Sequence, residues 1–414
     1  MIYLNFALYG GLLLILIKRA NKINLSILIV SIWALSAFFG IFYIKSSLYR
    51  EGRFPITMEP FIYLFICLII AMIPFFRQRT GINKIICNNK FLINISYGFA
   101  ILSIMPLIES FFQFGRLIIN GQFYMLGANY ADVALGNTTS LIKYSWFSER
   151  CMIVLNYFKL VTPILFYYFV QNKSKNKTIL TGLFSASFVP VLPSLAIGGK
   201  TQLTFFCLYF LGLFLFLQAS LSYSSRKFIK KILIILGSIV ASLIIALSIG
   251  RYIIGSEGSG SGPQEHLFQY FSESMLNFNQ NAFHETQKLD GIQSAQPLLL
   301  TLGLTNIPLE ERREFVSHKI YSPAHIFYSL FGDLYLDYGS STTIIILIIL
   351  AITFCQIKTE GNIMLYHLVL MGIYIFVMVN SLFYFSFKVS YDPIYGSILF
   401  AIFLKLFEKR TRVN

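Results

Sequence analysis

One short segment carries residues whose side chains could move a proton. The stretch "YSPAHIFYSLFGDLYLDYGS" holds His325, Tyr328 and Asp333, and a long apolar run follows it. Its proline suits the first turn of a helix, which would begin at about residue 323. That helix would set His325 on one face with the small residues Ser329 and Gly332, so a bulky ligand or a partner helix could approach it closely. His325 is therefore a candidate general base; the alternative is a histidine packed at the lipid–water interface.

Three basic residues at the ends of apolar runs could bind an anion. Arg251 ends one run in "ALSIGRYIIG", Lys200 follows a glycine pair in "SLAIGGKTQLTFF", and Arg116 follows another run in "FFQFGRLIING". Arginine binds phosphate through a planar fork of donors, whereas lysine acts as a point charge. Gly199 would let the backbone approach such a ligand closely. Snorkelling to lipid headgroups, or pairing with nearby acids, would also explain each of these cations.

Other patterns point to less specific roles. The stretch "LEERREFV" is typical of a solvated helix face. No set of residues has the spacing of a metal site, a phosphate-binding loop or a nucleophile elbow, so neither a metal nor a cofactor is expected. Lys159 lies within an apolar run and could line a polar cavity. Three of the five cysteines, Cys67, Cys207 and Cys355, lie in apolar runs, which is typical of small buried side chains rather than of a disulfide framework.

The elements that must position these residues are membrane-spanning helices. The chain has 414 residues, of which 56% are hydrophobic and only 12% charged. Apolar runs recur from end to end and are too continuous for barrel strands. The sequence thus predicts an all-α polytopic membrane protein with about eleven transmembrane helices. The predicted spans are roughly 2–17, 25–44, 58–76, 91–112, 150–170, 179–197, 203–220, 232–250, 341–356, 363–386 and 391–407.

The distribution of charge orients these spans. If the amino terminus lies outside, most lysines and arginines fall in short cytoplasmic connections, as the positive-inside rule requires. Nearly all acidic residues then fall on the outer side, except Glu360 and Glu408. The net charge of +15 is therefore mostly an orientation signal, and nucleic acid is not an expected partner. We expect residues 1–414 to form a single integral membrane domain, with residues 251–340 as a large, structured outer loop that contains short helices.

These features resemble, in their order, the O-antigen and oligosaccharide repeat-unit polymerases of the Wzy type. A basic residue after a glycine-rich turn, an arginine at the end of the next span, a large outer loop and an aromatic–Asp–Tyr–Gly segment follow one another. "QYFSESMLNFN" looks like the aromatic segment of that family's large loop, and "SPAHIFYSLFGDLYLDYG" is similar to its segment before the next span. The resemblance covers residues 180–345 in motif and the remainder in topology only.

The resemblance implies a membrane glycosyltransferase of GT-C-like architecture in the bacterial inner membrane, with its active site facing the periplasm. Such enzymes transfer a growing chain from undecaprenyl pyrophosphate to the next lipid-linked repeat. Arg251 and Lys200 would stabilise the pyrophosphate, although relatives often have arginine at the position of Lys200. His325 would activate the acceptor hydroxyl, and Asp333 would hold His325 or a sugar hydroxyl. Arg116, Tyr328 and Gly199 would contact substrate.

The implied partners are the two lipid-linked oligosaccharides, the bilayer, a chain-length regulator of the Wzz type and a flippase of the Wzx type. Three other functions stay open. An O-antigen ligase, which transfers finished chains to lipid A–core, would carry similar residues on the same face. A flippase or transporter of lipid-linked sugars would carry charges within several spans, whereas here nearly all charge is peripheral. A structural membrane protein would not need outer cations around one cavity.

Overall fold

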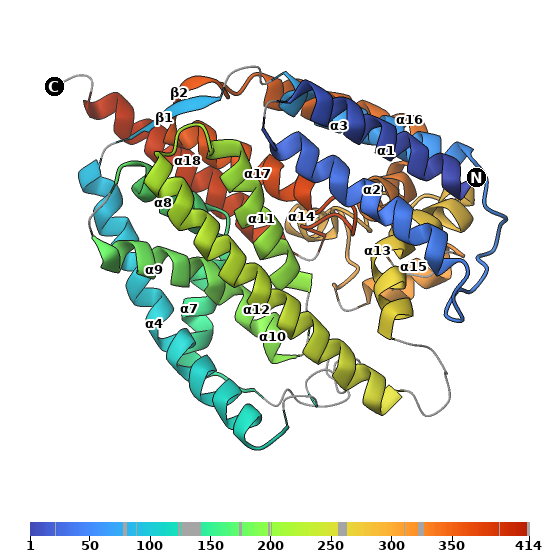
Figure 1. Ribbon diagram of the computed structural model, residues 1–414, viewed down its shortest axis with the longest axis horizontal. Helices are drawn as coiled ribbons and strands as arrows, with labels where there is room; N and C mark the ends of the chain where they lie inside the picture. Colours follow the sequence, from blue (N-terminus) through green and yellow to red (C-terminus); the bar gives the residue numbers. More distant parts are fainter. Residues whose placement is uncertain are drawn as a thin grey trace. The chain divides into compact units, whose positions relative to one another are not determined.

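A computed structural model describes the backbone of residues 1–20, 22–77, 81–87, 89–122, 125, 142–173, 176–197, 199, 201–255, 263–309, 311–321, 327–388 and 390–411 (Figure 1). Side chains are described for these residues except 89–91, 244, 246–255, 263 and 408–411. The chain is mostly helical and its backbone forms two compact units. Unit 1 comprises Met1–Arg79, Ser261–Lys358 and Tyr374–Tyr391, and unit 2 comprises Thr80–Gly260, Thr359–Ile373 and Asp392–Asn414. Each unit is described by itself.

Unit 1 contains three apolar helices from the start of the chain and the segments that follow residue 261. Its elements are α1 (Ile2–Arg19), α2 (Leu25–Tyr43), α3 (Glu59–Phe76), α13 (Pro263–Gln280), the short 3-10 turn η2 (Ala282–His284), α14 (Gln296–Thr301), α15 (Arg312–Lys319) and α16 (Ser329–Cys355). Helix α2 packs against both α1 and α13, and α3 packs against α16. Aromatic contacts tie α1, α2 and α16 together: Tyr9 stacks on Trp33 with centroids 5.6 Å apart, and Trp33 lies 5.4 Å from the tilted ring of Phe331.

Unit 2 contains the middle of the chain and its end. Its elements are β1 (Ile82–Ile86), α4 (Asn89–Ile119), α7 (Trp146–Tyr157), α8 (Val161–Gln171), α9 (Lys177–Phe188), η1 (Val189–Val191), α10 (Leu192–Ala196), α11 (Thr201–Leu217), α12 (Tyr223–Gly255), β2 (Gly361–Met364) and α18 (Asp392–Thr411). Helix α17 (Leu365–Val379) is divided between the two units. The strands β1 and β2 form a parallel pair with Ile82 opposite Gly361, which the sequence analysis did not predict.

Local sequence explains where several helices begin. Asn24, Ser145 and Asn176 each precede a helix, and each side chain accepts a hydrogen bond from a backbone N–H in the first turn. These residue types favour the position because their oxygens satisfy an N–H that has no partner within the helix. The apolar side chains that follow then drive burial or lipid contact.

Among the residues that the structure describes, six helices are long and apolar enough to cross a membrane, or seven if a bent pair counts as one span. They are α1, α2, α3, α4 from Leu92, the α9–α10 segment Lys177–Ala196, and α16; the bent pair is α7 and α8. This supports a helical membrane protein, and the prediction of eleven spans with an outer loop stays a prediction. The bend between α7 and α8 is 71°, and Lys159 lies at the break.

Two predicted helix boundaries were wrong: the start of α16 and the end of α17. The helix expected from about residue 323 begins at Ser329, and it reaches the apolar run as α16 with one non-helical residue, Gly339, along its length. The span predicted over 363–386 ends as a helix at Val379. The side chains of Asn380 and Ser381 bond back to the carbonyls of Phe376 and Met378, and such bonds compete with further helix. The rest of that apolar run forms turns.

Candidate functional site

The start of α16 is held by the turns that follow α17. Ser329 has a left-handed backbone (φ 69°), its N–H donates to the carbonyl of Phe383 (3.1 Å), and the N–H of Leu330 donates to Ser381 (2.7 Å). The hydroxyl of Ser329 accepts from the N–H of Gly332 (3.2 Å). A strained residue of this kind persists only where its surroundings fix it. These contacts place residues 380–388 next to the first turns of α16.

Asp333 is a fully buried carboxylate whose acceptor sites are occupied. Gln293 donates through Nε2 to Oδ1 (3.0 Å), and the N–H of Phe385 donates to Oδ2 (2.8 Å). The ammonium of Lys388 lies 3.4 Å from Oδ2, and its side chain is only 12% exposed. A buried charge is tolerated when it is paired and hydrogen-bonded in this way. Asp333 therefore anchors Lys388.

Asp337 lies one helical turn after Asp333 on the same face of α16, and it is also buried. It accepts hydrogen bonds from the N–H groups of Gln293 (2.8 Å) and Ser294 (2.7 Å), and from the hydroxyl of Ser294. The two carboxylates thus fix one turn, residues 289–295, against the helix.

A glycine makes that docking possible. Gly339 interrupts α16 with φ 79° and ψ 179°, a conformation open to glycine but rare for other residues. The carbonyls of Leu336 and Asp337 accept from the N–H groups of Leu289 (3.0 Å) and Asp290 (3.2 Å). The break in the helix therefore exposes backbone acceptors that an uninterrupted helix would have used internally.

Arg312 completes a cluster of two cations and two carboxylates, which we call the buried charge cluster: Asp333, Asp337, Lys388 and Arg312. Arg312 is the first residue of α15, is half-buried, and donates through one terminal nitrogen to the carbonyl of Lys388 (2.7 Å). This is the one hydrogen bond of its guanidinium among the residues that the structure describes. Since a guanidinium carries five N–H donors, the remaining donors are available to an anion.

Burial lowers the pKa of Lys388, the Asp333 carboxylate raises it partway back, and the Arg312 guanidinium lowers it again. Burial also lowers the pKa of Arg312, against the carboxylates of Asp333 and Asp337. An added anion would be held by the directed donors of Arg312.

An aromatic pair borders the cluster. The rings of Phe327 and Tyr384 stack with centroids 5.5 Å apart and planes at 21°. The ammonium of Lys388 lies 4.6 Å from the centroid of the Tyr384 ring. Both aromatic side chains are half-buried, so part of each remains available for apolar contact with a ligand such as a sugar ring.

The predicted site residues fall in different places. His325 and Lys200 lie outside the described residues; Arg251 lies in α12, and its side chain is not described. Asp333 and Tyr328 both belong to unit 1, and the Tyr328 side chain is buried, with an exposed fraction of 1%. The small residues near His325 do not form an open face, because a Cβ on Gly332 would lie 3.0 Å from the Phe278 ring of α13.

The remaining two predicted residues belong to unit 2. Arg116 is exposed in the last turn of α4. Gly199 is buried, its N–H donates to the carbonyl of Ser194 (2.8 Å), and its own carbonyl accepts from the Ser194 hydroxyl (3.2 Å). The backbone of Gly199 is thus engaged within the chain. The substrate contacts expected of these residues stay predictions.

Sequence reasoning missed Arg312 and Lys388. Arg312 lies among the charges of "LEERREFV", which indicate a solvated helix, and Lys388 follows an aromatic run. The criterion applied to Arg251 could have found both: a basic residue on the predicted outer side runs against the charge bias and so indicates a specific role. Among the residues that the structure describes, no three His, Cys, Asp or Glu side chains are grouped as metal ligands would be.

Comparison of the chain with family models, curated proteins and solved structures finds no match.

Proposed function

We propose that this protein is a membrane glycosyltransferase that joins lipid-linked oligosaccharide repeat units at the outer surface of a bacterial inner membrane. The observation that carries the proposal is the buried charge cluster, in which Asp333 and Asp337 of α16 meet Arg312 of α15 and Lys388 from the turns after α17. There Arg312 is fixed by a bond to the Lys388 backbone and keeps further donors available. A reaction that expels a pyrophosphate from a sugar needs such fixed donors, because they are already oriented when negative charge develops.

The step is a substitution at the anomeric carbon. The hydroxyl oxygen of the acceptor repeat forms a bond to that carbon, the bond to the pyrophosphate oxygen breaks, and the hydroxyl proton passes to a base. Undecaprenyl pyrophosphate leaves with the bonding electrons. Arg312 would bind the leaving phosphates, Lys388 would add positive charge nearby, and Phe327 and Tyr384 would contact a sugar ring.

The predicted residues would take the following roles. Asp333 acts as a positioning residue, since its carboxylate already holds Lys388, Gln293 and a backbone N–H. His325 would accept the hydroxyl proton. The phosphate contacts predicted for Arg251 and Lys200 stay predictions.

A gel of lipopolysaccharide from a strain lacking the gene tests the proposal. Loss of a repeat-unit polymerase leaves core carrying a single repeat, and the wild-type gene restores the long ladder. Bare core with long chains on the lipid carrier would instead identify a ligase. Bare core with single repeats held on the carrier inside the cell would identify a flippase. Strains that carry either Arg312→Gln or the control Arg313→Gln are compared at measured protein amounts. Loss of the long ladder in Arg312→Gln but not in Arg313→Gln would link the phenotype to the buried charge cluster.

A further inference from the structure

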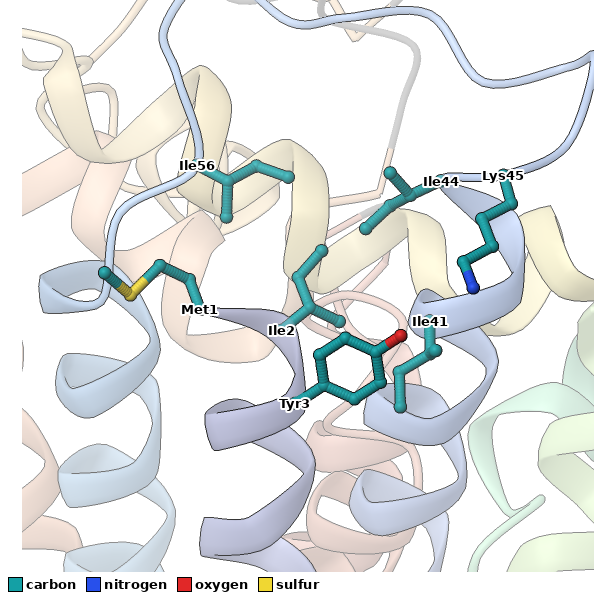
Figure 2. Close-up of a pocket in the computed structure, with 7 residues that line it drawn as sticks. All are labelled: Met1, Ile2, Tyr3, Ile41, Ile44, Lys45 and Ile56. Carbon is teal, nitrogen blue, oxygen red and sulfur yellow. The ribbon is translucent and has the colours of Figure 1, made fainter.

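A pocket of about 320 Å³ lies where α1 begins and α2 ends, entirely within unit 1 (Figure 2). Such a volume is at the lower end of the range of small-molecule sites. Residues from the start of α1, the end of α2 and the connection to α3 line it: Met1, Ile2, Tyr3, Ile41, Ile44, Lys45 and Ile56. The pocket therefore has aliphatic walls and two polar side chains, which end in the Lys45 ammonium and the Tyr3 hydroxyl.

The two polar groups lie on one side of the pocket, next to Ile41 (Figure 2). Lys45 is exposed and forms no ion pair with any residue that the structure describes. The first turn of α1 adds backbone N–H groups without a side-chain cap, and the amino end of a helix favours an anion. The aliphatic walls and the cation together suit a ligand with an apolar chain and an anionic head.

The position of the pocket defines the ligand further. Both α1 and α2 are candidate membrane spans, so the start of one and the end of the other lie at the level of lipid headgroups. Little of α1 is buried, and Tyr3 and Leu4 are exposed at 63% and 56%. Tyrosine and lysine are the residues expected at this level. A lipid can therefore enter the pocket directly from the bilayer.

We propose that this pocket binds one anionic phospholipid, with its phosphodiester against Lys45 and Tyr3 and the adjoining part of an acyl chain against Ile41, Ile44 and Ile56. A single lysine matches the single negative charge of a phosphodiester, whereas a pyrophosphate would call for more cations. The proposal does not depend on the proposed function of the buried charge cluster.

Photolabelling of the full-length protein tests the site. The probe is phosphatidylglycerol with a photoreactive group near the head of one acyl chain, and labelled peptides are mapped by mass spectrometry. We expect labelling of residues 1–3 and 41–45. Lys45→Gln should reduce it about fivefold, because one lysine near a membrane surface contributes on that order. Ile41→Trp, which fills the pocket, should reduce it as well.

The matched control is Lys22→Gln, the same charge change at the opposite ends of α1 and α2. It should leave labelling of residues 1–3 and 41–45 unchanged. Unlabelled phosphatidylglycerol should compete, and phosphatidylcholine with the same chains should not. Equal labelling of the wild type and Lys45→Gln would overturn the proposal. Stronger competition by an isoprenyl phosphate would also overturn it, in favour of the lipid carrier as the occupant.

Discussion

Among the described residues of the charged stretch, Arg312 is the one whose side chain reaches the buried charge cluster. Desolvating two cations and two carboxylates costs free energy that their mutual attraction only partly offsets, so such a cluster is weak support for stability. A task that needs fixed charge would explain such a cluster better than stability does. In the proposed function that task falls to Arg312, whose further donors would bind an anion, with Lys388 and the carboxylates as its support.

Arg312→Lys should lower polymerisation about a hundredfold or more, because lysine keeps the charge but loses the planar fork of donors. The measurement is chain growth per amount of protein in membranes, read from the product ladder. Arg313→Lys is the matched control, since Arg313 is the next residue and is exposed. Near-normal growth in Arg312→Lys would remove this side chain from the phosphate site.

Asp333→Asn should destabilise the protein by about 3–5 kcal/mol, because it leaves the buried Lys388 ammonium without its carboxylate. Adding Lys388→Met should recover part of the loss, with a coupling free energy of about 1–3 kcal/mol. The free energy of unfolding in detergent, measured for both single variants and the double variant, gives this value. Asp290→Asn, which breaks the exposed pair with Lys319, should cost at most about 1 kcal/mol. Strict additivity of the two cluster substitutions would contradict the pairing.

At the scale of elements, the break in α16 couples the helix to the turn of residues 289–295. Gly339→Ala should destabilise unit 1 by about 1–3 kcal/mol, since alanine disfavours φ 79°. Its Cβ would also lie 3.2 Å from Cε of Lys288. Thermal unfolding measures the change, and Ser340→Ala, one residue further on, is the control. An equal effect of the two substitutions would show that the break is not required.

Helix α13 carries a half-buried carboxyl, that of Glu273, which should make stability depend on pH. Burial raises the pKa of Glu273, and Asn277 lowers it only in part. The folded protein therefore holds this proton more tightly than the unfolded chain. The contribution of the Glu273 carboxyl to the free energy of unfolding is fully present below the ordinary pKa of 4.5. It is lost as pH rises through the raised pKa.

Glu273→Gln should remove that loss, so the variant should be more stable than the wild type at neutral pH and less sensitive to pH. Unfolding midpoints between about pH 4 and pH 8 test this, a window set by the ordinary carboxyl pKa and physiological pH. Glu265→Gln removes a carboxyl from the start of the same helix and is the control. A steeper pH dependence in Glu273→Gln would contradict the assignment.

At the scale of the whole molecule, apolar runs predicted helices well because length and composition decide where a membrane helix can form. The end of α17 was missed because "LFYFSF" after Ser381 is as apolar as a span, yet it folds back onto the start of α16. The β1–β2 pair was missed because residues 82–86 and 361–364 are far apart in the chain, and a local sequence pattern does not indicate pairing between distant segments.

The candidate site was predictable only in part. Asp333 stands out as an acid in an apolar segment, and the sequence analysis singled it out. Its partner Lys388 is 55 residues away in the chain, so the ion pair depends on how α16 and the turns after α17 meet. Arg312 was hidden among surface charges. Tertiary contacts, not residue spacing, distinguish Arg312 and Lys388 from basic residues that lie at the lipid–water interface without a specific role.

The most direct test of the account is chain growth by the purified protein in lipid nanodiscs supplied only with a lipid-linked repeat unit. We expect products of two, three and more repeats by mass spectrometry, with one isoprenyl pyrophosphate released for each new linkage. Growth should persist in a chelator and be lost in Arg312→Gln but not in Arg313→Gln. A repeat unit that stays single with the wild-type protein, or chains that grow equally in Arg312→Gln, would contradict the account.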